Sequence, residues 1–183
     1  MGIVRVTTTM SLDGFMAGPN HEMDWVFEYA GDIPAEATQE LIDTTGAILA
    51  GRGSYDVGRR STRRETSKPF GGRWSGPQLV VTHHPPDDEG DPSIRFISGD
   101  IRAAVETALE AAGGRNVLIF GANLANQCLD AALVDEIVIY LLPVVLGDGV
   151  RLFDADADRR LDLEPVDIVR YGNVASLHYR VAR

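Results

Sequence analysis

Three short segments carry residue types that could bind the phosphate groups of a nucleotide. They are Gly51-Arg52-Gly53-Ser54, Thr82-His83-His84 and Gly121-Ala122-Asn123-Leu124. Each follows an apolar run that predicts a β-strand, and the first and third open a predicted helix. Unpaired N–H groups at a helix N-terminus lie at the positive end of the helix dipole, so they can hold phosphate oxygens. The alternative is an ordinary strand-to-helix turn that uses glycine for steric reasons.

Other well-known chemistries find no support in the sequence. The patterns GxGxxG, GxxxxGK[ST] and HExxH do not occur. Cys128 is the single cysteine, so an intrachain disulfide and a cysteine-rich metal site are excluded. His83-His84 precedes Asp87-Asp88, but adjacent strand residues point to opposite faces and no third ligand is suitably spaced. We therefore expect no metal site.

The elements that must position these turns alternate between strand and helix. A helix is expected from Pro34 until Gly46 ends it, and a second helix is expected after Asp100, which would be its N-cap. The stretch from Phe15 to Asp32 has no stable hydrophobic period and predicts a long ordered loop. Such alternation predicts a largely parallel sheet with helices on both faces. Tyr171-Gly172-Asn173 predicts a terminal antiparallel hairpin with positive φ at Gly172 and Asn173. The eight predicted strands cover residues 3–8, 47–50, 79–82, 94–97, 117–120, 137–146, 166–170 and 174–181.

Length and composition predict one α/β domain over residues 1–183. The chain is 44% hydrophobic and 24% charged, which is ordinary for a globular protein. Its net charge of −10 opposes nonspecific binding to nucleic acid or an anionic membrane. No apolar run approaches the ~20 residues of a membrane span, and the N-terminus has no signal-type apolar block. We expect a cytoplasmic protein with a small-molecule substrate.

Four blocks, at residues 10–17, 48–55, 117–124 and 133–153, follow one another in a fixed order. Together they resemble the dihydrofolate-reductase-like family, and within it they are most similar to the C-terminal reductase domain of the bacterial riboflavin-biosynthesis deaminase/reductase. The resemblance implies a three-layer fold with a mostly parallel sheet of about eight strands. It also implies hydride transfer from NADPH to a small heterocycle or carbonyl compound, as in a 5-amino-6-(5-phosphoribosylamino)uracil reductase. The sequence has no zinc-binding deaminase signature, so we expect the reductase step only.

The resemblance also implies roles for individual residues. Gly51, Arg52 and Ser54 would meet the cofactor phosphates at a helix N-terminus. Thr82 and His83 would face the adenosine ribose and its 2′-phosphate. The turn formed by Gly121, Ala122, Asn123 and Leu124 would cradle the pyrophosphate. The segment that contains Met16, Ala17 and Trp25 would close over the nicotinamide and exclude water from the hydride path.

Three residues have competing interpretations. Reduction of a C=N bond needs a proton, and the resemblance implies a carboxylate near the start of the first helix, where Glu36 lies. The alternative is that Glu36 only stabilises the helix, because acidic residues favour helix N-termini for electrostatic reasons. Asp13 could bind substrate, although Asp-Gly is first of all a turn signal. Trp25 could contact substrate or simply fill the core.

Two departures from the family pattern affect the expected cofactor site. Phe120 precedes Gly121 where relatives have paired glycines, and His83 stands where relatives offer arginine, which binds phosphate more firmly than neutral imidazole. Two alternatives therefore stay open: dihydrofolate reductase proper, which would need Glu36, and a noncatalytic nucleotide-binding protein on the same scaffold. The apolar run 137–146 could contribute to a homodimer interface.

Overall fold

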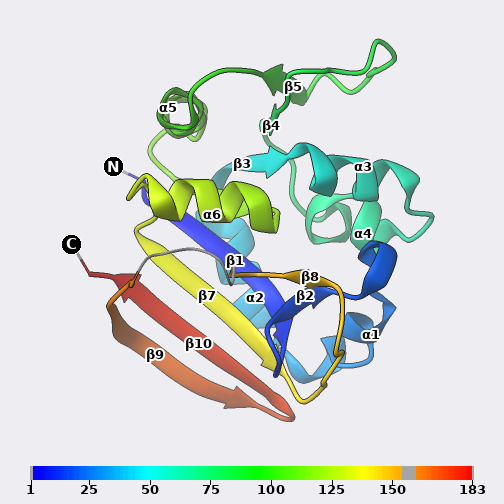
Figure 1. Cartoon of the computed structure of the whole chain (residues 1–183), viewed down its shortest axis with the longest axis vertical. Coiled ribbons are helices and arrows are strands. Elements are labelled where there is room, and N and C mark those ends of the chain that lie inside the picture. The colour runs from blue at the N-terminus through cyan, green and yellow to red at the C-terminus, as the bar shows by residue number, and fades with distance from the viewer. Residues whose placement is uncertain (1, 154–159, 183) are drawn as a thin grey trace.

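The aliphatic runs of the chain form an eight-stranded sheet in the computed structural model, which describes residues 2–153 and 160–182. The strand order is β5-β4-β3-β6-β1-β7-β10-β9 (Figure 1). These strands are β1 (Val4–Ser11), β3 (Thr45–Gly51), β4 (Gln78–Val81), β5 (Ile94–Ile97), β6 (Asn116–Phe120), β7 (Glu136–Leu142), β9 (Leu163–Tyr171) and β10 (Val174–Val181).

The sheet is parallel from β5 to β7, and β10 and β9 add to it as an antiparallel hairpin. This confirms the predicted three-layer α/β fold. The hairpin turn differs in one detail: Gly172 has a φ of +56°, whereas Asn173 has no positive φ. Asn173 instead donates from its backbone N and its Nδ2 to Asp32 Oδ2, both at 3.1 Å, which fixes the hairpin to the segment before α2 (Ala35–Thr44).

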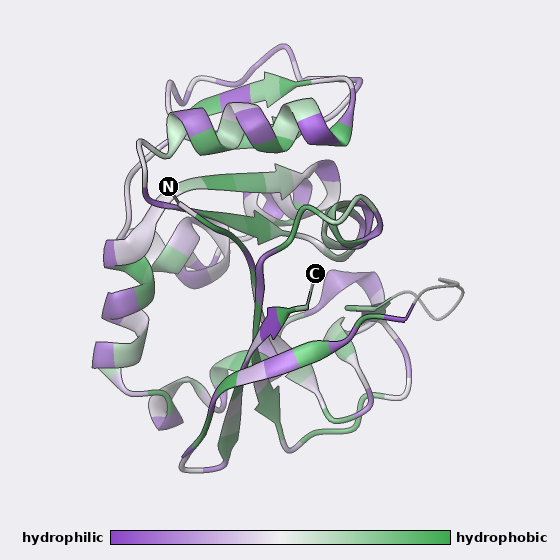
Figure 2. Ribbon diagram, turned by 90° about the vertical axis from the view of Figure 1, so that its left-hand side faces the viewer, coloured by the Kyte–Doolittle hydropathy of each residue, from purple (hydrophilic) through white to green (hydrophobic). Residues whose placement is uncertain are grey.

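Helices cover both faces of the sheet. In Figure 1, α6 lies in front of the sheet and α2 lies behind it, and Figure 2 shows the apolar strands between these layers. Asp100 caps α5 as predicted, since its Oδ1 accepts from Arg102 N at 2.8 Å and Ala103 N at 3.3 Å. The helices are α1 (Asp24–Phe27), α2 (Ala35–Thr44), α3 (Arg52–Arg60), α4 (Arg64–Ser67), α5 (Ile101–Ala111) and α6 (Ala122–Asp130).

Two local predictions need correction. Gly46 does not end α2, which stops at Thr44; Gly46 instead lies within β3. An added Cβ at Gly46 would come within 2.8 Å of Ala112 Cα. Glycine is therefore needed for close packing against the end of α5. The stretch from Phe15 to Asp32 is also more regular than a loop. It contains β2 (Phe15–Ala17), which pairs with β8 (Val150–Arg151) in a small second sheet, as well as α1 and two 3₁₀ turns.

The apolar run 137–146 is divided rather than continuous. Strand β7 ends at Leu142, before Pro143, and it lies between β1 and β10 with Ile137, Ile139 and Leu142 buried. Only Val145, 70% exposed, is a large exposed hydrophobic residue of this run in the described chain. The run therefore offers no broad apolar surface, and a homodimer stays a prediction. Over the described residues, none of the helices has the length and apolar character needed to cross a bilayer.

Candidate active site at the carboxyl edge of the sheet

The three predicted turns lie side by side because their strands are neighbours in the sheet. Gly51 is paired with Val81 at the end of β4, and Ala50 is paired with Phe120 at the end of β6. The turns after these strands therefore leave the same edge of the sheet. The side chain of Arg52 links the turn after β3 to the turn after β4, because its Nη1 donates to the carbonyl oxygen of His84.

Glycine at position 121 permits the close approach of α3 and α6. Gly121 has a φ of +104°, and an added Cβ would lie 2.7 Å from Ser54 Oγ and 3.8 Å from Gly51 N. The left-handed backbone conformation and the contact both disfavour a larger residue. The N-caps of the two helices are Gly51 and Gly121, and neither makes a side-chain capping bond. Two helix N-termini thus converge, and their first N–H groups are suited to an anion.

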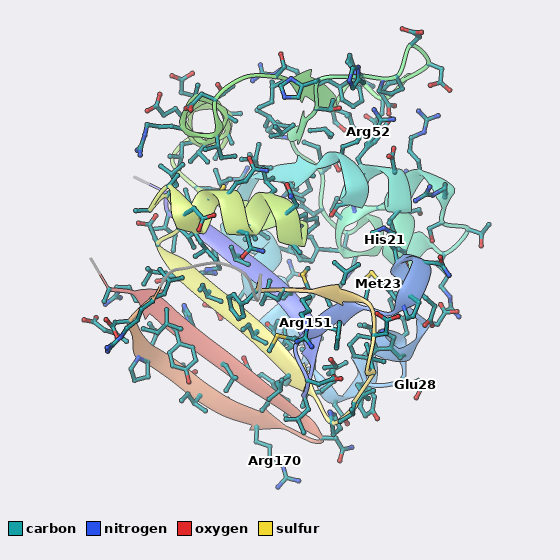
Figure 3. All side chains as sticks on the ribbon, viewed as in Figure 1. His21, Met23, Glu28, Arg52, Arg151 and Arg170 are labelled. Atoms are coloured by element: carbon teal, nitrogen blue, oxygen red, sulfur yellow. The ribbon has the colours of Figure 1, made fainter. Side chains whose placement is uncertain are left out.

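The side chains around the first turn are held by internal contacts. Arg52 Nε donates to Asp56 Oδ1 at 2.8 Å, and the Arg52 side chain is 38% exposed. Figure 3 places Arg52 near the start of α3, far from Arg170 on the hairpin. Thr82 Oγ1 accepts from His84 N at 3.1 Å, and His83 is exposed. Arg52 therefore remains accessible to a ligand, while Thr82 stabilises its own turn.

A charged hollow of about 400 Å³ lies beside Arg52, between α3 and the segment after β4. Arg59 crosses it and donates from Nη1 and Nη2 to the two carboxylate oxygens of Asp88, at 3.2 and 3.1 Å. Hydrogen bonds from Arg59 lower the pKa of Asp88. We call this the arginine hollow; it is lined by Arg52, Tyr55, Asp56, Arg59, Arg60, Pro86 and Asp88.

A second cavity, of about 290 Å³, opens where β1 leaves β6. The pairing of these strands ends at Val6 with Ile119, whereas β1 continues beside β7 as far as Ser11 with Leu142. Strands β1, β6 and β7 and helices α1 and α2 contribute to its wall. We call it the hydroxyl cavity; it is lined by Thr7, Thr8, Thr9, Phe27, Ile33, Thr38, Leu41, Phe70, Leu118, Phe120 and Tyr140.

Phe120, which departs from the family pattern, forms part of this wall. Its ring contacts that of Phe70, with centroids 6.5 Å apart and an interplanar angle of 62°. Phe70 has φ +52° and ψ +34°, a left-handed conformation that is uncommon for a bulky residue. Phe120 therefore shapes the hydroxyl cavity rather than filling the turn at Gly121.

Glu36 lies away from the cavity lining. It is exposed in the first turn of α2, whereas Thr38 and Leu41 are the α2 residues that line the hydroxyl cavity. Among the lining residues, all within the described chain, Tyr140 is the only one with an ionisable side chain. Burial raises the pKa of Tyr140 above its ordinary value of 10.0. A catalytic role for Glu36 stays a prediction that this placement does not favour.

Asp13 fastens the turn after β1 to the segment after β7. Its Oδ1 accepts from Ser11 Oγ at 2.7 Å and from Leu146 N at 3.1 Å, and its Oδ2 accepts from Gly147 N at 2.7 Å. The Ser11 hydroxyl and these backbone donors lower the pKa of Asp13 to about 2. Both carboxylate oxygens are thus engaged, which favours the turn interpretation over substrate binding.

The other residues assigned to the covering segment lie outside the hydroxyl cavity lining. Trp25 is buried with Leu142 and Val174, and its Nε1 has no partner among the described residues. Met16 packs against the main core, and Ala17 is buried in β2. The structure therefore gives Trp25 a core role, and contact of Met16 or Ala17 with a cofactor stays a prediction.

The remaining turn residues serve the start of α6. Leu124 is buried in the core beneath the turn. The carbonyl oxygen of Ala122 accepts from Asn126 Nδ2 at 2.9 Å, and Asn123 is exposed with its Oδ1 accepting from Gln127 Nε2 at 2.6 Å. Ala122 and Asn123 thus contribute backbone rather than side-chain groups to the turn.

Comparison with known proteins decides the family. Residues 3–177 match the family described as the RibD C-terminal domain. This chain belongs to the RibD C-terminal domain family. The uncharacterised protein YwjB of Bacillus subtilis is 26% identical over 176 residues, which cover 93% of this chain and 92% of that protein.

Solved structures show the same fold as this RibD C-terminal domain. A candidate riboflavin biosynthesis protein from Shewanella sp. PV-4 superposes with a TM-score of 0.81 at 21% identity, covering 99% of both chains. The riboflavin biosynthesis reductase Rib7 of Saccharomyces cerevisiae superposes with a TM-score of 0.64 at 19% identity, covering 99% of this chain and 90% of Rib7. The chain therefore shares the fold of these two proteins.

Sequence reasoning missed the wall of the hydroxyl cavity in this RibD C-terminal domain. One signal was present: Thr7, Thr8 and Thr9 are consecutive in a strand at the centre of the sheet, where aliphatic residues are expected. Thr38 and Tyr140 carried no comparable signal. Their position depends on how α2 packs and on the register of β7 beside β1.

Proposed function

We propose that this protein is an NADPH-dependent reductase that transfers a hydride to a small heterocyclic or carbonyl compound. The main support is that two helix N-termini with glycine N-caps and the side chain of Arg52 converge at the sheet edge where the hydroxyl cavity also opens. Ligands of open α/β sheets bind outside the carboxyl ends of the strands, where such turns meet. Membership of the RibD C-terminal domain family supports a nicotinamide cofactor.

The coenzyme would bind through its phosphates. The N-termini of α3 and α6 suit the pyrophosphate, and Arg52 suits the adenosine 2′-phosphate because a guanidinium forms charge-assisted hydrogen bonds with phosphate oxygens. Arg59 and Arg60 line the adjoining arginine hollow and add positive charge there. This distribution favours NADPH over NADH.

The reaction would need a hydride and a proton. Bound NADPH would supply the hydride to the carbon of a C=N or C=O group of the substrate, and the nitrogen or oxygen of that group would take up the proton. We assign the proton to the Tyr140 hydroxyl, because Tyr140 is the ionisable group of the cavity wall within the described chain. The tyrosinate then recovers a proton from water. Dihydrofolate reductase proper is less favoured, because Glu36 is not part of that wall.

The test is a titration of NADPH and NADH against the wild-type protein and Arg52→Ala. We expect Arg52→Ala to weaken NADPH binding by about 1.5–3 kcal/mol, the usual loss for a hydrogen bond to a charged group, with little effect on NADH. Arg115→Ala is the matched control, since Arg115 is exposed just before β6, at the opposite end of that strand. Equal weakening of both coenzymes would contradict 2′-phosphate recognition by Arg52.

A noncatalytic nucleotide-binding protein would behave differently in one further measurement. It would bind NADPH but would not oxidise it with any member of a panel of heterocycles and carbonyl compounds. The proposed reductase oxidises NADPH in the presence of at least one of them.

A further inference from the structure

The two aspartates of the arginine hollow neutralise most of its positive charge. Arg52 Nε donates to Asp56 Oδ1 at 2.8 Å, one turn further along α3. Arg59 Nη1 and Nη2 donate to Oδ1 and Oδ2 of Asp88, at 3.2 and 3.1 Å. The lining therefore holds three arginines and two aspartates, and two of the arginines already have a carboxylate partner. An anionic ligand that enters the hollow competes with carboxylates of the protein itself.

Arg59 is held in place by contacts that do not involve Asp88. Its Nη1 donates to the Tyr55 hydroxyl oxygen at 3.0 Å, and its guanidinium carbon lies 5.9 Å from the centre of the Tyr55 ring. Tyr55 is buried, and its ring packs edge-on against Phe96, with the ring centroids 5.2 Å apart. Because Tyr55 is fixed in this way, the Arg59 guanidinium would keep its position if Asp88 moved away.

Asp88 is the more exposed partner of the pair, and it can move without the rest of its segment. Its side chain is 75% exposed, compared with 40% for Arg59. The segment is anchored one residue later, where Glu89 Oε2 accepts from the Tyr55 hydroxyl at 2.6 Å and Glu89 Oε1 accepts from Asp91 N at 2.8 Å. Solvent-exposed ion pairs contribute little to stability. Rotation of the Asp88 side chain off Arg59 therefore costs little and leaves the wall of the hollow in place.

The pair formed by Arg59 and Asp88 has the geometry of a phosphate contact. Two N–H groups of one guanidinium meet the two oxygens of the carboxylate, and the same fork can bind two phosphate oxygens. In dinucleotide-binding sites, a carboxylate near the adenosine ribose typically accepts from the 2′-hydroxyl of NAD, whereas a nearby arginine accommodates the 2′-phosphate of NADP. The arginine hollow contains both groups, and they are bonded to each other.

We propose that Asp88 sets the coenzyme selectivity of this protein: its carboxylate stays on Arg59 and accepts from the ribose 2′-hydroxyl when NADH binds, and it gives up Arg59 to the 2′-phosphate when NADPH binds. This inference rests on the proposed function. Binding of NADPH then includes the loss of the contact between Arg59 and Asp88, whereas binding of NADH does not. The preference for NADPH is therefore smaller than the arginines alone would produce, and removal of the Asp88 charge should increase it.

The test compares the dissociation constants of NADPH and NADH, measured by calorimetry, for the wild type, Asp88→Asn and Asp87→Asn. Asp87→Asn is the matched control, since it removes the same charge one residue earlier, from an exposed residue outside the lining of the hollow. We expect Asp88→Asn to tighten NADPH binding about two- to fivefold, as for the loss of an exposed ion pair that competes with the ligand, and not to tighten NADH binding. Asp87→Asn should leave the ratio of the two constants unchanged. An unchanged ratio in Asp88→Asn, or an equal change of the ratio in Asp87→Asn, would overturn the inference.

A second substitution shows whether Asp88 acts through Arg59. In an Arg59→Ala background NADPH has no guanidinium to take from Asp88, so the addition of Asp88→Asn should no longer tighten NADPH binding. An equal gain in that background would mean that Asp88 acts only through its charge, and it would overturn the inference. If neither coenzyme binds the wild type, the proposed reductase and this inference fail together. If both coenzymes bind and Asp88→Asn leaves their ratio unchanged, the inference fails alone.

Crystal structures of two complexes would show the Asp88 carboxylate directly. Adenosine 2′,5′-bisphosphate carries the 2′-phosphate and 5′-AMP lacks it, so the two ligands isolate that group. We expect the contact between Arg59 and Asp88 to persist with 5′-AMP and to be replaced by a phosphate contact with the bisphosphate. A contact between Arg59 and Asp88 that is intact in the bisphosphate complex would overturn the inference.

Discussion

The arginine hollow and the hydroxyl cavity lie at the same edge of one sheet but have opposite polarity. The first lies between α3 and the segment after β4 and has five charged side chains in its lining. The second lies where β1 leaves β6, and within the described residues its lining has only hydroxyl and apolar side chains. The arginine hollow offers ionic contacts, which suit the phosphorylated coenzyme that we propose, whereas the hydroxyl cavity offers only shape and hydrogen bonds.

Polarity follows from the elements that build each region. Helix α3 is short, is rich in charge and lies at the periphery of the sheet, so Arg52 and Arg59 keep contact with water. Strand β1 is central, and at the cavity it carries the uncharged hydroxyl side chains of Thr7 to Thr9, whereas the charged Arg5 nearer its start is paired with Glu136. The comparison is tested by variants that should affect one region and leave the other unchanged.

The largest effect is expected for Tyr140→Phe. Loss of a general acid typically lowers the rate by about 10²- to 10⁴-fold, so kcat should fall about a hundredfold or more in NADPH oxidation with a substrate that the protein reduces. The wild-type kcat should be lost only as pH rises through the pKa of Tyr140, which burial raises above 10.0. Coenzyme affinity should not change, because Tyr140 is not in the arginine hollow. An unchanged kcat would show that the proton comes from another source.

Gly121→Ala should weaken coenzyme binding about tenfold or more and lower the thermal midpoint. The new methyl would meet Ser54 Oγ at 2.7 Å and would force alanine into a φ of +104°. Gly114→Ala separates the two causes, because Gly114 has a φ of +88° but nothing within 4 Å of an added Cβ. It should lower the midpoint without changing coenzyme affinity. Equal loss of affinity in both variants would mean that the turn at Gly121 has no specific role.

The charged region was easier to predict from sequence than the uncharged one. Glycine after a strand and arginine at a helix start are local signals, so the turns at Gly51 and Gly121 could be placed from the strand pattern alone. The hydroxyl cavity combines residues from β1, α2 and β7, and no local pattern shows that Thr38 and Tyr140 share a wall with Thr7. Gly46 shows the same limit, since its glycine serves packing against Ala112 and not the end of α2.

Asp13→Asn should reduce stability and leave both cavities functional. Because the folded pKa of Asp13 is about 2 and the ordinary value is 3.8, its ionised form stabilises the fold above pH 3.8, and this contribution is lost as pH falls toward 2. The difference in thermal midpoint between wild type and variant should therefore be present at neutral pH and shrink below pH 3.8. Loss of substrate turnover in a variant that is still fully folded would restore the substrate-binding role for Asp13.

The smallest effect is expected for Glu36→Gln. Glu36 is exposed in the first turn of α2, where a negative charge favours the helix by about 0.3–1 kcal/mol through its dipole, so only a slight loss of stability should follow. Turnover should not change with any substrate that the protein reduces. A strong fall in kcat, with coenzyme affinity intact, would mean that α2 brings Glu36 to the cavity when substrate binds. The uncharged character of the hydroxyl cavity would then hold only for the free protein, and the contrast with the arginine hollow would disappear during catalysis.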